Sequence, residues 1–180
     1  MKLYVMRHGP AEDQSSSGQD GDRALTASGR ERVRAVAKVL VDVEEVPLAI
    51  ITSPLVRAVQ TAEVVAMVTR VGQGKGSVEV RREMSPSGNA AALVNSLVAE
   101  GRKRAMIVGH EPDLGDLVTT LLEDGSFRRG FEKAMVVGLQ VAVPATRQGQ
   151  LSAEAGRRTR LRFVLDPKAL RLDPDLRALT

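Results

Sequence analysis

The chain has 180 residues, of which 43% are hydrophobic and 2% aromatic, and it contains no cysteine. This length suffices for one α/β domain with a sizeable core but not for two ordinary domains, so we expect a single domain over residues 1–180. The lack of cysteine excludes disulfides, thiolate nucleophiles and cysteine-ligated metal sites from this chain.

The charge balance argues against a nucleic-acid partner. The chain has 26 basic and 22 acidic residues, with a formal net charge of +4. Much of the excess lies in Arg157, Arg158, Arg160 and Arg162, whose near-alternation is typical of one solvated strand face, although it would also attract an acidic substrate. Because there are almost no aromatic side chains to stack bases, we expect no nucleic-acid binding.

The hydropathy pattern predicts neither a membrane span nor a signal peptide. No apolar run approaches the roughly 20 residues that a spanning helix needs. The first residues, Met1–Val5, lead directly into a strand pattern. We therefore expect a soluble, cytoplasmic, monomeric protein with no membrane partner.

The N-terminal part of the chain is predicted to contain a strand, a loop and a helix. Lys2–Arg7 has the apolar content of a strand, and Gly9-Pro10 ends it with a turn. Gln14–Asp22 is too polar to bury and is expected to be a mobile surface loop. A helix is predicted from Thr26, because apolar residues recur at helical spacing between positions 33 and 41.

A second junction from strand to helix follows. Leu48–Thr52 is predicted to be a buried strand, and Ser53-Pro54 has the N-cap and first-turn chemistry of a helix start. The helix is expected to run to about Thr69 and to carry Arg57 in its first turn. Val78–Arg82 is predicted to form a short third strand.

The C-terminal half is predicted to continue this alternation and then to change. Apolar spacing predicts a helix from Ala90 to near Gly101, a buried strand at Ala105–Val108 and a helix after the turn Gly109–Pro112. The later strand patterns are separated by a connection poor in helix formers and predict an antiparallel hairpin; they lie at Met135–Val143 and Leu161–Leu165. The tail after Asp166 gives no clear pattern.

These elements predict a three-layer α/β/α fold with a mostly parallel sheet, whose ligand crevice lies where the strands end and turn into helices. Three motifs fall at such ends, and between them they hold both histidines of the chain, His8 and His110. We expect these histidines and Arg57 to share one pocket, with the imidazoles within about 10 Å of each other.

Phosphoryl transfer explains this concentration of residue types. A neutral imidazole can attack phosphorus and later leave when water attacks, which suits His8. Guanidinium groups stabilise the charge on the equatorial oxygens, which suits Arg7 and Arg57, and His110 can donate a proton to a nonbridging oxygen. No zinc-motif spacing surrounds the histidines and the arginines would repel a cation, so no metal and no cofactor is expected.

Four ordered motifs resemble those of the histidine phosphatase, or phosphoglycerate mutase-like, superfamily. They are Arg7-His8-Gly9, the Leu-Thr-x-x-Gly element of Leu25–Gly29, the Ser-x-x-x-Arg-Ala-x-Gln-Thr-Ala element of Ser53–Ala62, and Gly109-His110. The short length and the Met-Arg-His-Gly start are similar to the small SixA-type phosphohistidine phosphatases. The resemblance implies a phosphoglycerate mutase-like fold, a phosphorylated His8, and phosphate-pocket roles for Arg7, Arg57 and His110.

One departure from the family pattern bears on the substrate. Larger mutase-like members place a proton-donating Glu in a Leu-x-Glu segment, whereas the corresponding stretch here is Met84-Ser85-Pro86. Glu83 is a candidate donor, as are Glu12 and Asp13 on the first loop, but none matches the family position. Arg23 is a further candidate for substrate binding, and for Arg23 and Glu83 an ordinary exposed charge explains the residue as well.

The missing donor favours a substrate that leaves without a strong enzymatic acid. Phosphohistidine can take a proton on its second ring nitrogen and depart as neutral imidazole, whereas an alkoxide benefits from a donor by about 100- to 10,000-fold. The chain has no large insertion that would close a lid, although the loop Gln14–Asp22 has the length to fold over a small ligand. We therefore expect a phosphohistidine-bearing protein as substrate. The alternatives are a small phosphate ester or a non-catalytic module that binds a phosphorylated partner.

Overall fold

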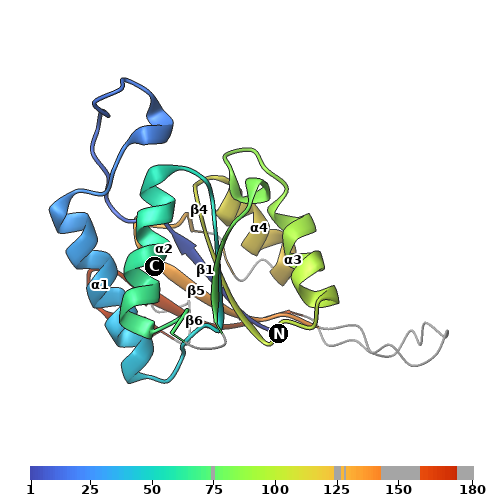
Figure 1. The fold of residues 1–180 in the computed structure, drawn as a ribbon. Coiled ribbons are helices and arrows are strands. Elements are labelled where there is room, and N and C mark those ends of the chain that lie inside the picture. The colour runs from blue at the N-terminus through green and yellow to red at the C-terminus, as the bar shows by residue number, and fades with distance from the viewer. Residues whose placement is uncertain (74–75, 124–126, 128, 143–158, 174–180) are drawn as a thin grey trace.

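A computed structural model describes residues 1–73, 76–123, 127, 129–142 and 159–173 of the chain. Its centre is one sheet of seven strands in the order β3-β2-β4-β1-β5-β6-β7 (Figure 1). The strands are β1 Lys2–Arg7, β2 Ala49–Thr52, β3 Ser77–Val80, β4 Arg104–Gly109, β5 Val136–Gln140, β6 Arg160–Asp166 and β7 Arg171–Asp173.

The sheet has a parallel half and an antiparallel half. Strands β3, β2, β4 and β1 run parallel, whereas β5 pairs antiparallel with β1, β6 with β5, and β7 with β6. This arrangement confirms the parallel pairing of the first four strands and the antiparallel pairing of the two late strands, and it makes the sheet a mixed one. The first strand has the predicted ends, and the ends of the other strands differ from the prediction by at most three residues. The third strand stops at Val80 because residues Arg82–Met84 form a 3₁₀ turn.

Helices cover both faces of the sheet, as a three-layer fold requires (Figure 1). Helices α1 (Ala27–Asp42) and α2 (Val56–Thr69) pack with the face of β1 that carries Tyr4 and Met6. The other face of β1, with Leu3 and Val5, belongs to the core shared with α3 (Ala90–Ala99) and α4 (Asp113–Leu122). These four side chains of β1 are fully buried, so side chains that point alternately to the two faces of this strand contribute to both cores.

The start of α1 explains why the Leu-Thr-x-x-Gly element has its composition. Thr26 is the N-cap, and its hydroxyl accepts a hydrogen bond from the Gly29 amide at 2.9 Å. The Thr26 amide donates to the Pro10 carbonyl, and a Cβ on Gly29 would lie 2.0 Å from that same oxygen. Only glycine therefore lets α1 approach the loop that follows β1.

Two predicted features need correction. Ser53 does not cap α2: Leu55 is the N-cap in an extended conformation, and the helix begins at Val56. The tail beyond Asp166 contains β7, which the sequence pattern does not predict. The Asp166 carboxylate accepts hydrogen bonds from the amides of Lys168 and Ala169, and this turn directs the chain back along β6.

Of the four arginines predicted to lie on one solvated strand face, the structure describes Arg160 and Arg162, and these two differ. Arg160 is exposed, but Arg162 donates two hydrogen bonds to the Glu45 carboxylate, at 2.8 and 2.6 Å. Tyr4 and Lys2 donate to the same carboxylate, so Glu45 ties β1 to β6. These hydrogen bonds, with that of Arg162 the strongest, lower the pKa of Glu45 to about 2. Arg157 and Arg158 lie outside the described residues.

No helix in the described part of the chain is both long enough and apolar enough to cross a membrane.

Candidate active site

The carboxyl ends of β1, β2 and β4 bring the three sequence motifs together. Arg7 is in register with Gly109, and Thr52 with Val108. Just beyond these pairs, the His8 amide donates to the Gly109 carbonyl at 3.1 Å. The Ser53 amide donates to the Val108 carbonyl at 3.0 Å. The ladder hydrogen bonds thus continue one residue past each strand and place His8 beside His110.

The two imidazole rings lie side by side, well within the roughly 10 Å expected from the sequence. Their centroids are 5.2 Å apart with an interplanar angle of 52°. His8 is 6% exposed and His110 is 5% exposed, so both rings are largely withdrawn from solvent. Because the effective dielectric constant is low at a buried site, N–H donors stabilise a negative charge there more strongly than they do in water.

The His8 ring is held in one tautomer by the backbone. Its Nδ1 lies 2.8 Å from the Gly9 carbonyl oxygen, which can only accept, so Nδ1 carries the proton and Nε2 carries the lone pair. The Gly9 amide in turn donates to the Thr61 hydroxyl, which donates to the Arg57 carbonyl on α2. A Cβ on Gly9 would lie 2.6 Å from Val33, so close packing on α1 also fixes this turn.

His110 is oriented by Ser53, the residue that the sequence pattern assigns to a helix cap. The His110 Nε2 lies 2.8 Å from the Ser53 hydroxyl oxygen. The Leu55 amide donates to the same oxygen at 3.3 Å, so Ser53 links the start of α2 to the imidazole. His110 Nδ1 is buried without a hydrogen-bond partner among the described residues.

The guanidinium groups of the site have unused hydrogen-bonding capacity. Arg7 donates from Nη1 to the Phe131 carbonyl at 2.6 Å, and Arg57 donates to Asp20. Five buried side-chain nitrogens have no partner among the described residues, and four of them belong to this region: Nε of Arg7, Arg23 and Arg57, and Nδ1 of His110. Unpaired buried donors are costly, and an oxyanion bound between them would satisfy them.

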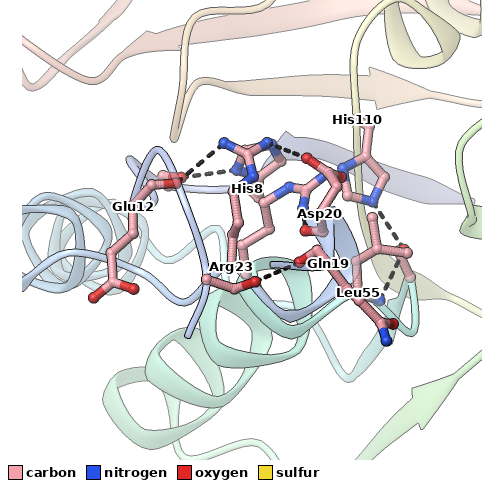
Figure 2. A network of polar contacts seen from close by, with 11 residues as sticks. His8, Glu12, Gln19, Asp20, Arg23, Leu55 and His110 are labelled. Carbon is pink, nitrogen blue, oxygen red and sulfur yellow. Dashed lines mark hydrogen bonds and ion pairs between the residues drawn. The ribbon is translucent and has the colours of Figure 1, made fainter. Parts of the chain in front are cut away.

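The remaining candidates from the sequence have different positions. Arg23 joins the cluster indirectly, through an ion pair of 2.7 Å with Asp20. Glu83 lies in the 3₁₀ turn before Ser85, and its carboxylate makes no hydrogen bond or ion pair with the described residues. Glu12 meets Arg23 through its backbone carbonyl, and its carboxylate points away from His8 and His110 (Figure 2). Asp13 is exposed.

The loop Gln14–Asp22 lies on the surface, as the sequence predicts, and one of its residues contacts the site. Its backbone and side chains are joined by hydrogen bonds from Ser15 and Ser17. Asp20 then attaches the loop to Arg57, whose side chain is 6% exposed (Figure 2).

Sequence reasoning also missed a role for Glu111, which follows His110. Its carboxylate accepts hydrogen bonds from the amides of Gly115 and Phe131. Because the Phe131 carbonyl accepts from Arg7, Glu111 holds the segment that orients this guanidinium. The local contact of Glu111 with Gly115, in the turn after Gly109-His110, is of a kind that a sequence pattern can indicate. The contact with Phe131 joins residues far apart in the chain and leaves no local pattern.

Burial makes both imidazoles neutral. Desolvation, opposed by the hydrogen bond to Gly9 and aided by the charges of His110, Arg57 and Arg7, lowers the pKa of His8 to about 3. Desolvation, followed by the charge of Arg57, lowers the pKa of His110 to about 4. His8 therefore keeps the lone pair that a nucleophile needs throughout the neutral range.

These pKa values predict a pH-dependent stability. The unfolded chain takes up protons on both histidines near pH 6.5 while the folded chain does not, so the free energy of unfolding should fall as the pH drops below about 6.5. From pH 7.5 to pH 5 we expect a loss of roughly 2 kcal/mol for each histidine, at 1.36 kcal/mol per pH unit. Urea unfolding at the two pH values measures this loss. His8→Ala should lose less over the same interval than the wild type, and an equal loss would contradict the burial of a neutral His8.

Among the described residues, no three His, Asp or Glu side chains form a group that could hold a metal ion. That the enzyme works without a metal ion stays a prediction, which activity in the presence of excess chelator tests.

Comparison with known proteins agrees with this geometry. The model of the histidine phosphatase superfamily (branch 1) matches residues 3–80. Phosphohistidine phosphatase SixA of Escherichia coli (strain K12) is 33% identical over 128 residues, which cover 67% of this chain and 74% of SixA. The chain belongs to the histidine phosphatase superfamily. An uncharacterised protein of Picosynechococcus sp. is 34% identical over 144 residues, covering 78% of this chain and 85% of that protein.

The fold leads to the same superfamily. The structure of the protein histidine phosphatase SixA complexed with tungstate superimposes with a TM-score of 0.76 and 25% sequence identity. The match covers 95% of this chain and 100% of that one, which confirms the phosphoglycerate mutase-like fold. Membership of the histidine phosphatase superfamily supports phosphatase activity for this chain.

Proposed function

We propose that this protein hydrolyses phosphohistidine on a protein partner, and that His8 carries the phosphoryl group in transit. The observation that carries the proposal is the His8 ring itself. Its Nδ1 proton is held by the Gly9 carbonyl and its neutral Nε2 lies in a pocket with His110. A fixed, neutral imidazole with one free lone pair is the form that attacks phosphorus.

The reaction proceeds in two displacements. In the first, the Nε2 lone pair of His8 forms a bond to phosphorus while the bond to the leaving group breaks and its electron pair departs with that group. In the second, water attacks the phosphorus, the N–P bond breaks, and its electron pair returns to Nε2 with release of inorganic phosphate. Arg7, Arg57 and His110 supply N–H donors to the nonbridging oxygens in both steps.

The leaving group decides the substrate class. A phosphorylated histidine whose second ring nitrogen is protonated leaves as neutral imidazole, so the enzyme needs no strong acid. An alkyl phosphate leaves as an alkoxide and requires a positioned donor. The candidate carboxylates are not held in a position to act as that donor, because the Glu83 carboxylate makes no hydrogen bond or ion pair with the described residues and Glu12 points away from the imidazoles (Figure 2).

The relatives support the same choice. The relative in Escherichia coli is a phosphohistidine phosphatase, and tungstate, an oxyanion, is bound in the structure of the protein histidine phosphatase SixA. An oxyanion would suit the unpaired guanidinium and imidazole nitrogens of this chain.

A small phosphate ester is the second candidate, and one feature favours it. The loop that follows β1 borders an open hollow of about 390 Å³, lined among others by Gln14, Gln19, Asp20 and Arg23 but by neither imidazole. This volume lies in the range of small-molecule sites. A module that binds phosphorylated partners without turnover would use the same residues, but an intact, neutral His8 argues for catalysis.

Competition between substrates tests the proposal. We expect kcat/KM for a phosphohistidine-bearing phosphotransfer domain to exceed that for each member of a panel of sugar and nucleotide phosphates, in the presence of excess chelator. Better turnover of a panel ester would assign the site to small molecules. Binding of the phosphorylated domain without phosphate release would favour the binding module.

A further inference from the structure

Asp20 occupies the guanidinium groups that a phosphoryl group would need. Its carboxylate Oδ2 lies 3.0 Å from Arg57 Nη2, and its Oδ1 lies 2.7 Å from Arg23 Nη2. Its backbone carbonyl accepts from Arg57 Nη1 at 2.8 Å. Both terminal nitrogens of Arg57 are therefore engaged by one residue, and this is the edge with which a guanidinium grips an oxyanion in bidentate fashion.

We propose that Asp20 is an internal competitor for the phosphate site, which the substrate's phosphoryl group displaces from Arg57 and Arg23, and that it thereby sets the site's affinity for oxyanions. This inference rests on the proposed phosphate site and adds to it a specificity-determining residue.

The exposure of the two partners fits displacement. The Asp20 side chain is 64% exposed, whereas that of Arg57 is 6% exposed. The arginine is thus fixed in the pocket, while the carboxylate reaches it from the solvent side and can leave without disturbing the core. Asp20 and Arg23 also line the 390 Å³ hollow, so a ligand bound in that hollow would contact both residues of this ion pair.

The charge of Asp20 fits competition better than proton donation. Desolvation alone would raise its pKa, but hydrogen bonds and charges from Arg57 and Arg23 outweigh this and hold the pKa below its ordinary value. The group is therefore a carboxylate anion at neutral pH. It has no proton to give to a leaving group, and it presents one carboxylate oxygen to Arg57 and the other to Arg23.

A phosphoryl dianion has the advantage in this exchange. It carries more charge than a carboxylate, and it can also accept from the unpaired nitrogens of Arg7 and His110, which Asp20 leaves without partners. A singly charged carboxylate ligand lacks both advantages. Any anion that binds here must first break the ion pairs of Asp20. The contacts of a phosphoryl group outweigh this loss of free energy, whereas those of a weaker anion do not.

The experiment measures the Kd of inorganic phosphate and of tungstate by isothermal titration calorimetry, without turnover. Asp20→Asn removes the competing charge, and Asp20→Ala also removes the side-chain hydrogen bond to Arg57 Nη2, while the backbone carbonyl of residue 20 is present in both variants. Asp22→Asn is the matched control, because it removes one charge from the same 3₁₀ turn and one loop hydrogen bond, from Ser17, without touching Arg57. We expect both Asp20 variants to bind phosphate about tenfold more tightly, and Asp22→Asn to bind like the wild type.

The outcomes separate this inference from the proposed function. The gain should disappear in the double variant Asp20→Asn, Arg57→Ala, because it acts through Arg57. Weaker binding in the Asp20 variants would make Asp20 a positioning residue for Arg57 and overturn the inference, and unchanged binding would overturn it as well. If no variant binds either oxyanion, the phosphate site itself is wrong. If oxyanions bind as expected but phosphohistidine is not the preferred substrate, only the proposed substrate fails.

Discussion

Replacing His8 with alanine should abolish hydrolysis of an aryl phosphate such as p-nitrophenyl phosphate. The His8 Nε2 is the nucleophile in the proposed reaction, and no thiol exists in this chain to take its place. His110 cannot substitute, because its Nε2 is engaged by Ser53 and its position follows a different strand. Loss of the atom that forms the covalent bond typically lowers kcat by about 10⁴-fold or more, so we expect no turnover above background.

Two further measurements make this result specific. The wild type should retain full activity in excess chelator, because the electrostatic stabilisation comes from guanidinium and imidazole groups. The wild type, but not His8→Ala, should also acquire an acid-labile phosphoryl label during turnover. Tungstate should still bind His8→Ala, since the donors of the pocket remain. Measurable catalysis by folded His8→Ala, or activity that requires a metal ion, would refute the mechanism.

Most of the fold could be predicted from the spacing of apolar residues and from the turn residues that end the strands, because both signals are local in the sequence. The apolar runs of β1, β2 and β4 lie in the middle of the sheet, where burial on both faces leaves an unmistakable pattern. Parallel strands place their carboxyl ends at one edge, so the convergence of His8 with His110 followed from the predicted topology. The short edge strand β7 has little apolar content, and its turn depends on Asp166, so it left no such signal.

The contacts that complete the site were beyond sequence reasoning because they join distant loops. Ser53 has the composition of a helix cap, yet its hydroxyl serves His110, fifty-seven positions away. Glu111 and Asp20 have ordinary surface composition, and only the folded chain brings them to Phe131 and Arg57. The sequence thus predicted which side chains share the pocket, while the partners that orient or occupy those side chains required the structure.

Replacing Arg57 or His110 with alanine should each raise the activation barrier by roughly 2.7–4 kcal/mol, which is a loss of about 10²–10³ in kcat. Each residue donates to the nonbridging oxygens in the proposed reaction, and removal of one such donor from a preorganised site has this effect. Arg57→Lys should recover only part of the loss, because an ammonium group keeps the charge but lacks the bidentate fork. Arg34→Ala, which removes an exposed arginine from α1, is the matched control and should leave kcat unchanged.

The two variants should differ in how they affect oxyanion binding. Arg57 carries a permanent positive charge, so Arg57→Ala should weaken the binding of phosphate as well as lower kcat. Burial lowers the pKa of His110 to about 4, so this residue is a neutral donor at pH 7 and contributes less to the ground state than to the developing charge. We therefore expect His110→Ala to lower kcat with a smaller change in the Kd of phosphate. Titration calorimetry beside steady-state kinetics checks this split, and a kcat within a fewfold of wild type in either variant would remove that residue from the phosphate pocket.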